Sequence, residues 1–197
     1  MERADKGLAF LLRYENVAWY EDGQVRILDR RIYPIRTEYV ICKKHEEVAQ
    51  AIADMVTQSG GPSTAAAMGM ALAAYEAKDK KEEDLIEYME KAAYTLSHAR
   101  PTTVEKMKRV VDGAMKVVRD EVSKGISGQD LVDALFDYAF HYIDNNYSKY
   151  SVIGSYLADQ IPQNGTVMTQ CFAETVIGTM LRECQKRGNE IKVICPE

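Results

Sequence analysis

Residues 164–174 read Asn-Gly-Thr-Val-Met-Thr-Gln-Cys-Phe-Ala-Glu, and this stretch decides the fold of the last third of the chain. It opens with the turn dipeptide Asn164-Gly165. Val167 and Met168 then form a short apolar run, which predicts a strand inside a sheet. Cys171 follows just before a helical pattern begins. The stretch therefore predicts a strand, a turn that carries a cysteine, and the start of a helix.

A helix and a second strand follow this cysteine. From Thr175 onward, apolar residues recur at helical spacing, at Val176, Ile177, Met180, Leu181 and Cys184. Lys186-Arg187-Gly188 ends the helix with cations and a glycine. Residues 191–195 predict a second apolar strand. Together these elements form a βαβ unit, and Cys171 lies at the carboxyl end of its first strand, where open α/β sheets bind ligands.

Composition restricts the class of protein. The chain has 197 residues, enough for one domain and part of a second. Its net charge of -5 argues against a nucleic-acid partner, because phosphate backbones are bound through basic patches. No apolar run approaches the roughly 18 to 20 residues that cross a bilayer, so no membrane partner is expected.

The cysteines and the N-terminus indicate the compartment. Cys42, Cys171, Cys184 and Cys195 lie far apart with no paired spacing, which argues against a disulfide framework or a zinc site. Residues 1–14 contain only a short apolar segment and no small-residue cleavage site, which argues against a secretory signal. A cytoplasmic location is expected.

The N-terminal part predicts a small sheet covered by helices. Residues 17–20 and 24–28 flank Asp22-Gly23 and predict a hairpin, and residues 39–42 predict a third strand. Helices are expected over residues 46–57, 85–98, 102–124 and 129–161, the last with a break near Asn145-Asn146, and over a stretch that Ser63 or Thr64 caps and that runs through Glu76.

The predicted fold class is therefore mixed α/β. A small N-terminal antiparallel sheet with a helical layer is followed by the beginning of a doubly wound, Rossmann-like domain. The expected domains are residues 1–162 for the sheet and helical layer, and residues 163–197 for the first βαβ unit.

Two stretches are candidate anion sites. Ser59-Gly60-Gly61-Pro62 leads into a helix, whose N-terminal amides can bind an anion while glycine allows close approach. A simple helix-to-helix turn with a Ser/Thr cap explains the same residues. Arg100 precedes Pro101 and Thr102 at another helix start, where a guanidinium can pair with a phosphate, although a surface arginine is the plainer interpretation.

Cys171 is the candidate reactive group. A thiol at a helix N-terminus can have a lowered pKa and act as a nucleophile or a general acid/base. Burial as a small apolar side chain is the alternative, and Glu174 would oppose both a thiolate and a bound phosphate nearby. His45, His98 and His141 have no second ligand at metal spacing, so structural roles are favoured for them and no metal is expected.

Taken together, these motifs resemble the family of S-methyl-5-thioribose-1-phosphate isomerases. Relatives in that family include ribose-1,5-bisphosphate isomerases and the regulatory subunits of translation initiation factor 2B. The resemblance runs along nearly the whole chain, through Leu28-Asp29-Arg30-Arg31, Ala53-Asp54-Met55-Val56, the alanine-rich residues 65–73, Arg100-Pro101-Thr102, Ile153-Gly154, the residues around Cys171, and Cys195-Pro196-Glu197.

The resemblance implies roles for particular residues. Cys171 would be the catalytic cysteine, and Arg100 a phosphate ligand. Ser59, Gly60 and Gly61 would form the phosphate-binding turn that is Arg-Gly-Ala in the family. Ser59 replaces the arginine of that turn, and Gln170-Cys171-Phe172 stands where the family has His-Cys-Asn. The family's catalytic acid and a phosphate-binding glutamine fall beyond Glu197, so the chain corresponds to a truncated, N-terminal part of the family length.

The implied activity is isomerisation of an aldose-1-phosphate to a ketose-1-phosphate, as in methionine salvage or related sugar-phosphate metabolism, and this short form is expected to lack full activity. The alternative is a non-catalytic subunit that senses a sugar phosphate or nucleotide, or that serves assembly, as in the translation-factor relatives. The implied reaction requires no cofactor. The expected partners are a small sugar phosphate and either a second copy of the chain, as in a homodimer, or another chain that completes the Rossmann-like domain.

Overall fold

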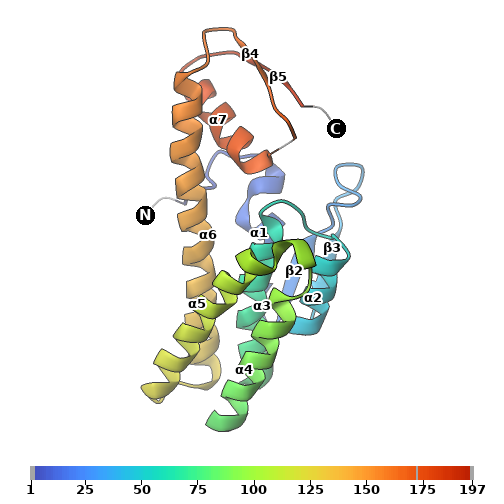
Figure 1. Cartoon of the computed structure of the whole chain (residues 1–197), viewed down its shortest axis with the longest axis vertical. Coiled ribbons are helices and arrows are strands. Elements are labelled where there is room, and N and C mark those ends of the chain that lie inside the picture. Colours follow the sequence, from blue (N-terminus) through green and yellow to red (C-terminus); the bar gives the residue numbers. More distant parts are fainter. Residues whose placement is uncertain (1–2, 172, 196–197) are drawn as a thin grey trace. The chain divides into compact units, whose positions relative to one another are not determined.

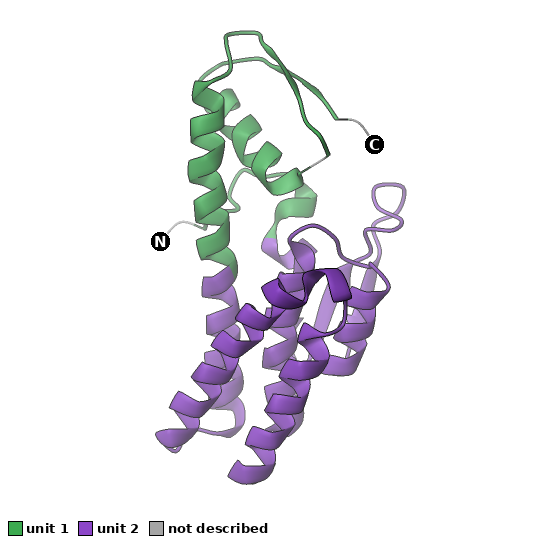
Figure 2. Cartoon of the chain, in the orientation of Figure 1, with its two compact units in different colours: residues 1–13, 143–197 green, residues 14–142 purple. Residues whose placement is uncertain are grey.

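A computed structural model describes residues 3–171 and 173–195. The chain divides into two compact units, which are coloured separately in Figure 2. Unit 2 comprises residues 14–142, and unit 1 comprises residues 1–13 together with residues 143–197. The structure confirms the mixed α/β class.

The sheet of unit 2 is built around a tight hairpin. Strands β1 (Ala18–Glu21) and β2 (Gln24–Leu28) pair antiparallel, with Glu21 opposite Gln24. Asp22 and Gly23 connect them with φ of 48° and 75°, which is the left-handed backbone of a two-residue hairpin turn. Strand β3 (Tyr39–Cys42) pairs antiparallel with the other edge of β2. The predicted hairpin and third strand are confirmed.

Unit 2 also contains helices, which pack on the sheet and on one another (Figure 1). They are α2 (His45–Ala53), α3 (Gly61–Ala77), α4 (Glu82–Ser97) and α5 (Val104–Ser123), together with the short helices α1 (Tyr14–Val17) and η2 (Pro101–Thr103). Helix α3 is apolar on every side and almost completely buried, because it contacts α2, α4 and α5 as well as β1 and β2. Its alanines let these neighbours approach closely, so α3 is the core element of the unit.

Two predicted helix boundaries are wrong for local reasons. Helix α2 ends at Ala53, before the predicted residue 57, because Met55 adopts a left-handed φ of 57°. The amides of Met55 and Val56 then donate to the carbonyls of Ile52 and Ala51, in the pattern that closes many helix C-termini. Helix α3 has Gly60 as its N-cap, so the predicted cap at Ser63 or Thr64 is also wrong.

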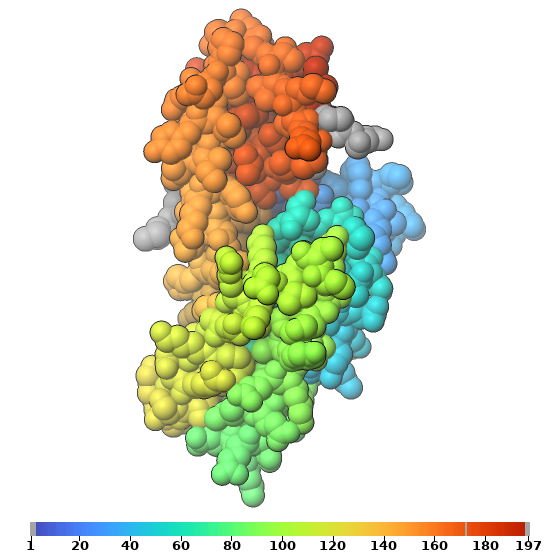
Figure 3. All heavy atoms as spheres, viewed as in Figure 1, coloured from blue at the N-terminus to red at the C-terminus, as the bar shows by residue number. Residues whose placement is uncertain are grey.

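Helix α6 (Gly128–Asp159) is continuous and belongs to both units. The break predicted near Asn145-Asn146 is absent, because apolar residues on both sides keep helical spacing, and Ile143 and Tyr147 are buried. The C-terminal part of α6 exposes large apolar side chains in unit 1, namely Val152, Ile153, Tyr156 and Leu157. Figure 3 shows the surface of this part of the chain in orange.

Unit 1 contains the predicted βαβ unit. Strand β4 (Thr166–Met168), helix α7 (Glu174–Lys186) and strand β5 (Lys192–Ile194) follow one another, and β4 pairs parallel with β5. One apolar cluster of the unit contains Ala158, Ile177, Met180 and Cys184, with Ile161, Ile191 and Val193 packed against it. Helix η1 (Phe10–Leu12) also contacts α7.

Among the described residues, no helix is both long and apolar enough to cross a membrane. The division into domains of residues 1–162 and 163–197 stays a prediction.

Candidate functional site

Cys171 lies in the turn between β4 and α7. The pairing of β4 with β5 extends past Met168, because the amide of Thr169 donates to the carbonyl of Ile194 at 3.0 Å. Ala173 is the N-cap of α7 and has a left-handed φ of 40°. The Cys171 thiol between them is free and exposed. The structure therefore places this thiol at the carboxyl end of a parallel strand, where open α/β sheets bind their ligands. Its neighbour Phe172 lies outside the described residues.

Glu174 is buried, although it begins α7. Burial, assisted by the negative charges of Asp5 and Glu174, raises the pKa of the Tyr147 hydroxyl, which hydrogen-bonds to the side chain of Thr175. Glu174 therefore belongs to the interior of unit 1, whereas the Cys171 thiol is exposed to solvent.

The glycine turn before α3 is tightly constrained. Ser59 is exposed with a left-handed φ of 56°, and Gly60 is the N-cap of the helix. The amide of Gly61 donates to the carbonyl of Gln58 at 2.8 Å, and a Cβ on Gly61 would overlap the side chain of Thr57. The Ser63 hydroxyl donates to the carbonyl of Gly60 at 2.9 Å. Ser59 is exposed and Gly60 is half-buried, whereas residues 61–64 at the start of the helix are buried.

Arg100 stands at the start of η2, directly before α5. Its carbonyl accepts hydrogen bonds from the amide of Thr103 at 3.1 Å and from the Thr103 hydroxyl at 3.3 Å. The Arg100 side chain is half-buried, and within residues 3–171 and 173–195 its guanidinium has no hydrogen bond or ion pair. An arginine held in place through its backbone and left without a protein partner is available to an anionic ligand.

The predicted site residues fall in both units. Ser59, Gly60, Gly61 and Arg100 belong to unit 2, where the N-terminal ends of α3 and α5 lie at the same end of the helical layer (Figure 1). Cys171 belongs to unit 1. The predicted phosphate ligands thus lie at one end of unit 2, and the thiol belongs to unit 1.

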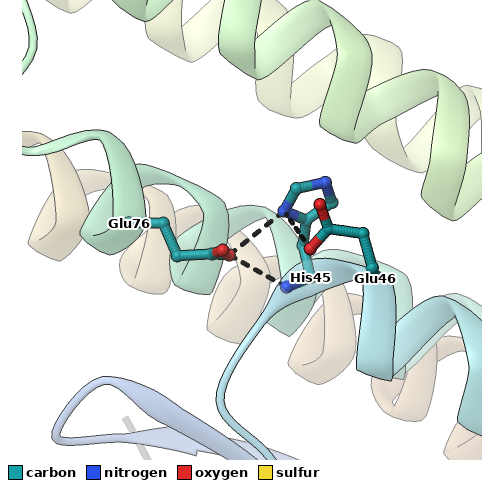
Figure 4. Close-up of side chains that lie close together, drawn as sticks. All are labelled: His45, Glu46 and Glu76. Atoms are coloured by element: carbon teal, nitrogen blue, oxygen red, sulfur yellow. Dashed lines mark hydrogen bonds and ion pairs between the residues drawn. The ribbon is translucent and has the colours of Figure 1, made fainter.

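A cluster around His45 was not predicted from the sequence. His45 begins α2 and is buried, and its Nδ1 lies 3.1 Å from Oε1 of Glu76 and 3.4 Å from Oε2 of Glu46 (Figure 4). The backbone amide of His45 donates to Glu76 at 2.9 Å, and the Tyr88 hydroxyl donates to the other oxygen of Glu76 at 3.0 Å. Burial opposes ionisation of Glu76, but the hydrogen bonds from His45 and Tyr88 outweigh it and lower its pKa.

Sequence spacing could not have revealed this cluster. Glu76 lies near the C-terminal end of α3, 31 residues after His45, and only the packing of α2 against α3 brings the two together. Only Glu46, which directly follows His45, could have been associated with it from the sequence alone.

Comparison with known proteins gives relatives of two kinds. The methylthioribose-1-phosphate isomerase of Caldanaerobacter subterraneus subsp. tengcongensis is 32% identical over 191 residues, which cover 90% of this chain and 53% of the relative. The enzyme of the same name from Thermosipho africanus is 29% identical over 195 residues, covering 94% of this chain and 54% of the relative. The chain thus spans about half the length of these isomerases.

Solved structures share the fold. The delta subunit of translation initiation factor eIF-2B from A. fulgidus is similar with a TM-score of 0.69 and 25% identity, over 91% of this chain and 54% of that one. The 5-methylthioribose 1-phosphate isomerase from Pyrococcus horikoshii is similar with a TM-score of 0.74 and 20% identity, over 91% of this chain and 60% of that one. Residues 57–197 match the sequence profile of the Initiation factor 2 subunit family. The chain belongs to the Initiation factor 2 subunit family.

Proposed function

We propose that this chain forms the phosphate-binding and thiol-bearing part of an isomerase that converts an aldose-1-phosphate to a ketose-1-phosphate, of the methylthioribose-1-phosphate type. The observation that carries the proposal is the exposed Cys171 thiol at the carboxyl end of β4, in a chain that matches isomerases of that name over nine-tenths of its length. A role in methionine salvage and a cytoplasmic location are part of this proposal.

The chemistry explains why such groups are needed. A phosphate on the anomeric oxygen prevents spontaneous ring opening, so the site must assist the opening before hydrogen moves from C2 to C1. The hydrogen stays within the sugar, so C2 is oxidised while C1 is reduced and no external oxidant is consumed. Cys171 would remove the proton from C2 and return it to C1, as a general acid/base. Arg100 and the turn Ser59-Gly60-Gly61 would hold the phosphate through charge-assisted and backbone hydrogen bonds.

The carboxylate that acts on the ring oxygen is not among these residues. We propose that it comes from the further part of the fold that the isomerase relatives possess, whether in a longer chain or in a second chain that completes the Rossmann-like domain. Alternatively, a second copy of this chain in a homodimer would supply residues next to the site.

The test is an assay for ketose formation from methylthioribose-1-phosphate, followed by NMR, with a version of the protein extended to the length of its relatives. Cys171→Ser is expected to lower kcat at least about a hundredfold, the lower end of what general acid/base catalysis supplies. Arg100→Gln is expected to raise KM, because it removes a phosphate contact. Cys195→Ser, at another exposed thiol, is the matched control. Complete inactivity of the extended protein would reject the isomerase proposal.

A non-catalytic role is the second candidate. Ser59 in place of a cationic phosphate ligand favours it, as does the structural similarity to a translation-factor subunit. Such a protein would bind a sugar phosphate or a nucleotide without turnover. Calorimetric titration of the extended protein with both kinds of ligand, beside the isomerase assay, distinguishes a sensor from an enzyme.

A further inference from the structure

We propose that His45, Glu46 and Glu76 bind a divalent transition-metal ion such as Zn²⁺, at a structural site in unit 2 that is separate from the proposed isomerase residues. The three ligand atoms are Nδ1 of His45 and one carboxylate oxygen from each glutamate, and all lie within 4.8 Å of one another (Figure 4). The site depends on neither Cys171 nor Arg100.

The two distances from His45 Nδ1 to the carboxylate oxygens are close to those in the ligand shell of a tetrahedral zinc ion. Bonds of about 2.0 to 2.2 Å to nitrogen and oxygen at tetrahedral angles separate neighbouring ligand atoms by about 3.3 to 3.5 Å. His45 Nδ1 lies 3.1 Å from Oε1 of Glu76 and 3.4 Å from Oε2 of Glu46. A small adjustment of the Glu46 side chain, which is 58% exposed, would bring all three atoms to bonding distance of one ion.

The count of protons also favours a cation. Nδ1 of His45 carries at most one proton, yet it faces Glu76 at 3.1 Å, Glu46 at 3.4 Å and the Tyr88 hydroxyl at 3.5 Å. The Tyr88 hydroxyl uses its own proton on Glu76. Two carboxylate oxygens and a hydroxyl thus converge on a single ring nitrogen. A divalent ion in the place of the shared proton would bind Nδ1 together with one oxygen of each glutamate.

The surrounding groups would orient the ligands. Glu76 is held by the backbone amide of His45 and by the hydroxyl of Tyr88, as metal-bound carboxylates commonly are by neighbouring donors. The Tyr88 ring also packs edge-on against the imidazole, with ring centroids 5.4 Å apart. Nζ of Lys80 lies over the Tyr88 ring, 5.1 Å from its centroid.

Burial defines both the walls and the entrance of the site. The side chains of His45 and Glu76 are only 4% and 14% exposed, whereas that of Glu46 faces solvent. An ion would thus enter from the side of Glu46 and would keep a water as its fourth ligand. Because the ligands come from α2 and α3, and Tyr88 comes from α4, the ion would connect three helices of the layer.

The test is a calorimetric titration of the purified, EDTA-treated chain with ZnCl₂, together with elemental analysis of the dialysed protein. The proposal expects one zinc site that Glu46→Gln weakens at least tenfold, because a direct ligand is lost. It also expects Zn²⁺ to raise the Tm of the wild type more than that of this variant. Zn²⁺ bound to the exposed thiols of Cys171 and Cys195 would be unaffected by Glu46→Gln, so the difference between the two proteins isolates this site.

Glu83→Gln is the matched control, because Glu83 is an exposed glutamate in the first turn of α4 as Glu46 is in the first turn of α2. Both variants keep the contacts of Glu76, so both should fold, which circular dichroism would verify. Equal zinc affinity for wild type, Glu46→Gln and Glu83→Gln would overturn the proposal and leave the cluster as a hydrogen-bonded helix contact.

Discussion

Gly154 of α6 lies directly against Thr179 of α7. A Cβ at position 154 would lie 2.6 Å from the Thr179 hydroxyl oxygen and 2.8 Å from the backbone nitrogen of Met180. Thr179 is completely buried, and its hydroxyl lies 2.9 Å from the carbonyl oxygens of both Tyr150 and Val176. Gly154 has no side chain, and the Thr179 hydroxyl has its hydrogen-bond acceptors within reach. Together these two features allow α6 and α7 to approach closely in unit 1.

Gly154→Ala is expected to destabilise unit 1. Alanine favours a helix over glycine by at most about 1 kcal/mol. The added methyl group, however, meets the backbone of α7, which no side-chain rotation can relieve, and overpacking of this kind costs about 1–3 kcal/mol. Urea denaturation should show a lower midpoint for this variant than for Lys149→Ala, an exposed substitution on the same helix. An equal midpoint for the two variants would show that the helices can separate without loss of stability.

Alanine substitutions at the neighbouring glycines Gly60 and Gly61 should differ in their effect on stability. A Cβ on Gly61 would overlap Thr57, whose side chain is buried, whereas Gly60 has open space around its Cβ position and a right-handed φ of -82°. Gly61→Ala is therefore expected to lose about 1–3 kcal/mol of stability. Gly60→Ala should stay within about 1 kcal/mol of the wild type. Thermal or urea denaturation of both variants measures this difference.

A double substitution tests the cause. Thr57→Ala combined with Gly61→Ala removes the overlapping atoms, so the pair should be more stable than the sum of the single changes. Strict additivity would mean that the glycine is needed for another reason. Because Gly60→Ala is expected to keep the fold, this variant can be used to test whether the turn binds phosphate.

The outline of the fold could be predicted because its signals are local. The Asp22-Gly23 turn specified the hairpin, and the change of period after Cys171 specified the βαβ unit. The helix end at Ala53 was missed because Met55 takes the left-handed position that glycine usually occupies, and composition does not show this. The His45 cluster was missed because it depends on the packing of α2 against α3. The phosphate ligands and the thiol were named from the sequence, and their roles stay predictions.

Asp29 should make stability depend on acid pH. Its carboxylate accepts from the backbone amide and Nε of Arg31 at 3.0 and 2.8 Å, and from Nη2 at 2.7 Å, and these hydrogen bonds lower the pKa of Asp29. A lowered folded-state pKa gives stability that is complete above the unfolded pKa of about 3.9, and that is lost as the pH falls through the lower folded value. Asp29→Asn should therefore cost about 1 kcal/mol at pH 7, since Arg31 is partly exposed.

The difference in unfolding free energy between wild type and Asp29→Asn should narrow as the pH falls below about 4, because Asp29 of the unfolded chain then takes up a proton. It should be smallest below the lowered folded-state pKa, where Asp29 is neutral in both states. Urea titrations at pH 7, 5, 4 and 3 provide the measurement. Asp79→Asn, at an exposed aspartate outside this ion pair, serves as the control. A difference that is constant over the whole series would mean that the ion pair with Arg31 contributes nothing that depends on charge.

The four cysteines should separate into two kinetic classes. Cys42 and Cys184 are each 1% exposed, and burial raises the pKa of both thiols, that of Cys42 to about 11. At pH 8 only about a thousandth of Cys42 would be thiolate, the form that reacts. Cys171 and Cys195 are exposed. A short pulse of iodoacetamide followed by mass spectrometry should therefore label Cys171 and Cys195 in the native protein, and all four cysteines in denaturant.

Cys171→Ser should remove one of the two rapidly labelled sites and leave Cys195 unchanged. The comparison bears directly on the proposed function, because a group that exchanges a proton with a sugar must be reachable by a small molecule from solution. If Cys171 in the native chain were labelled as slowly as Cys42, the thiol would not be accessible at the end of β4, and the isomerase proposal would lose the observation that carries it. Rapid labelling would establish this access, and the loss of kcat in the extended Cys171→Ser protein would then report the chemistry of the thiol alone.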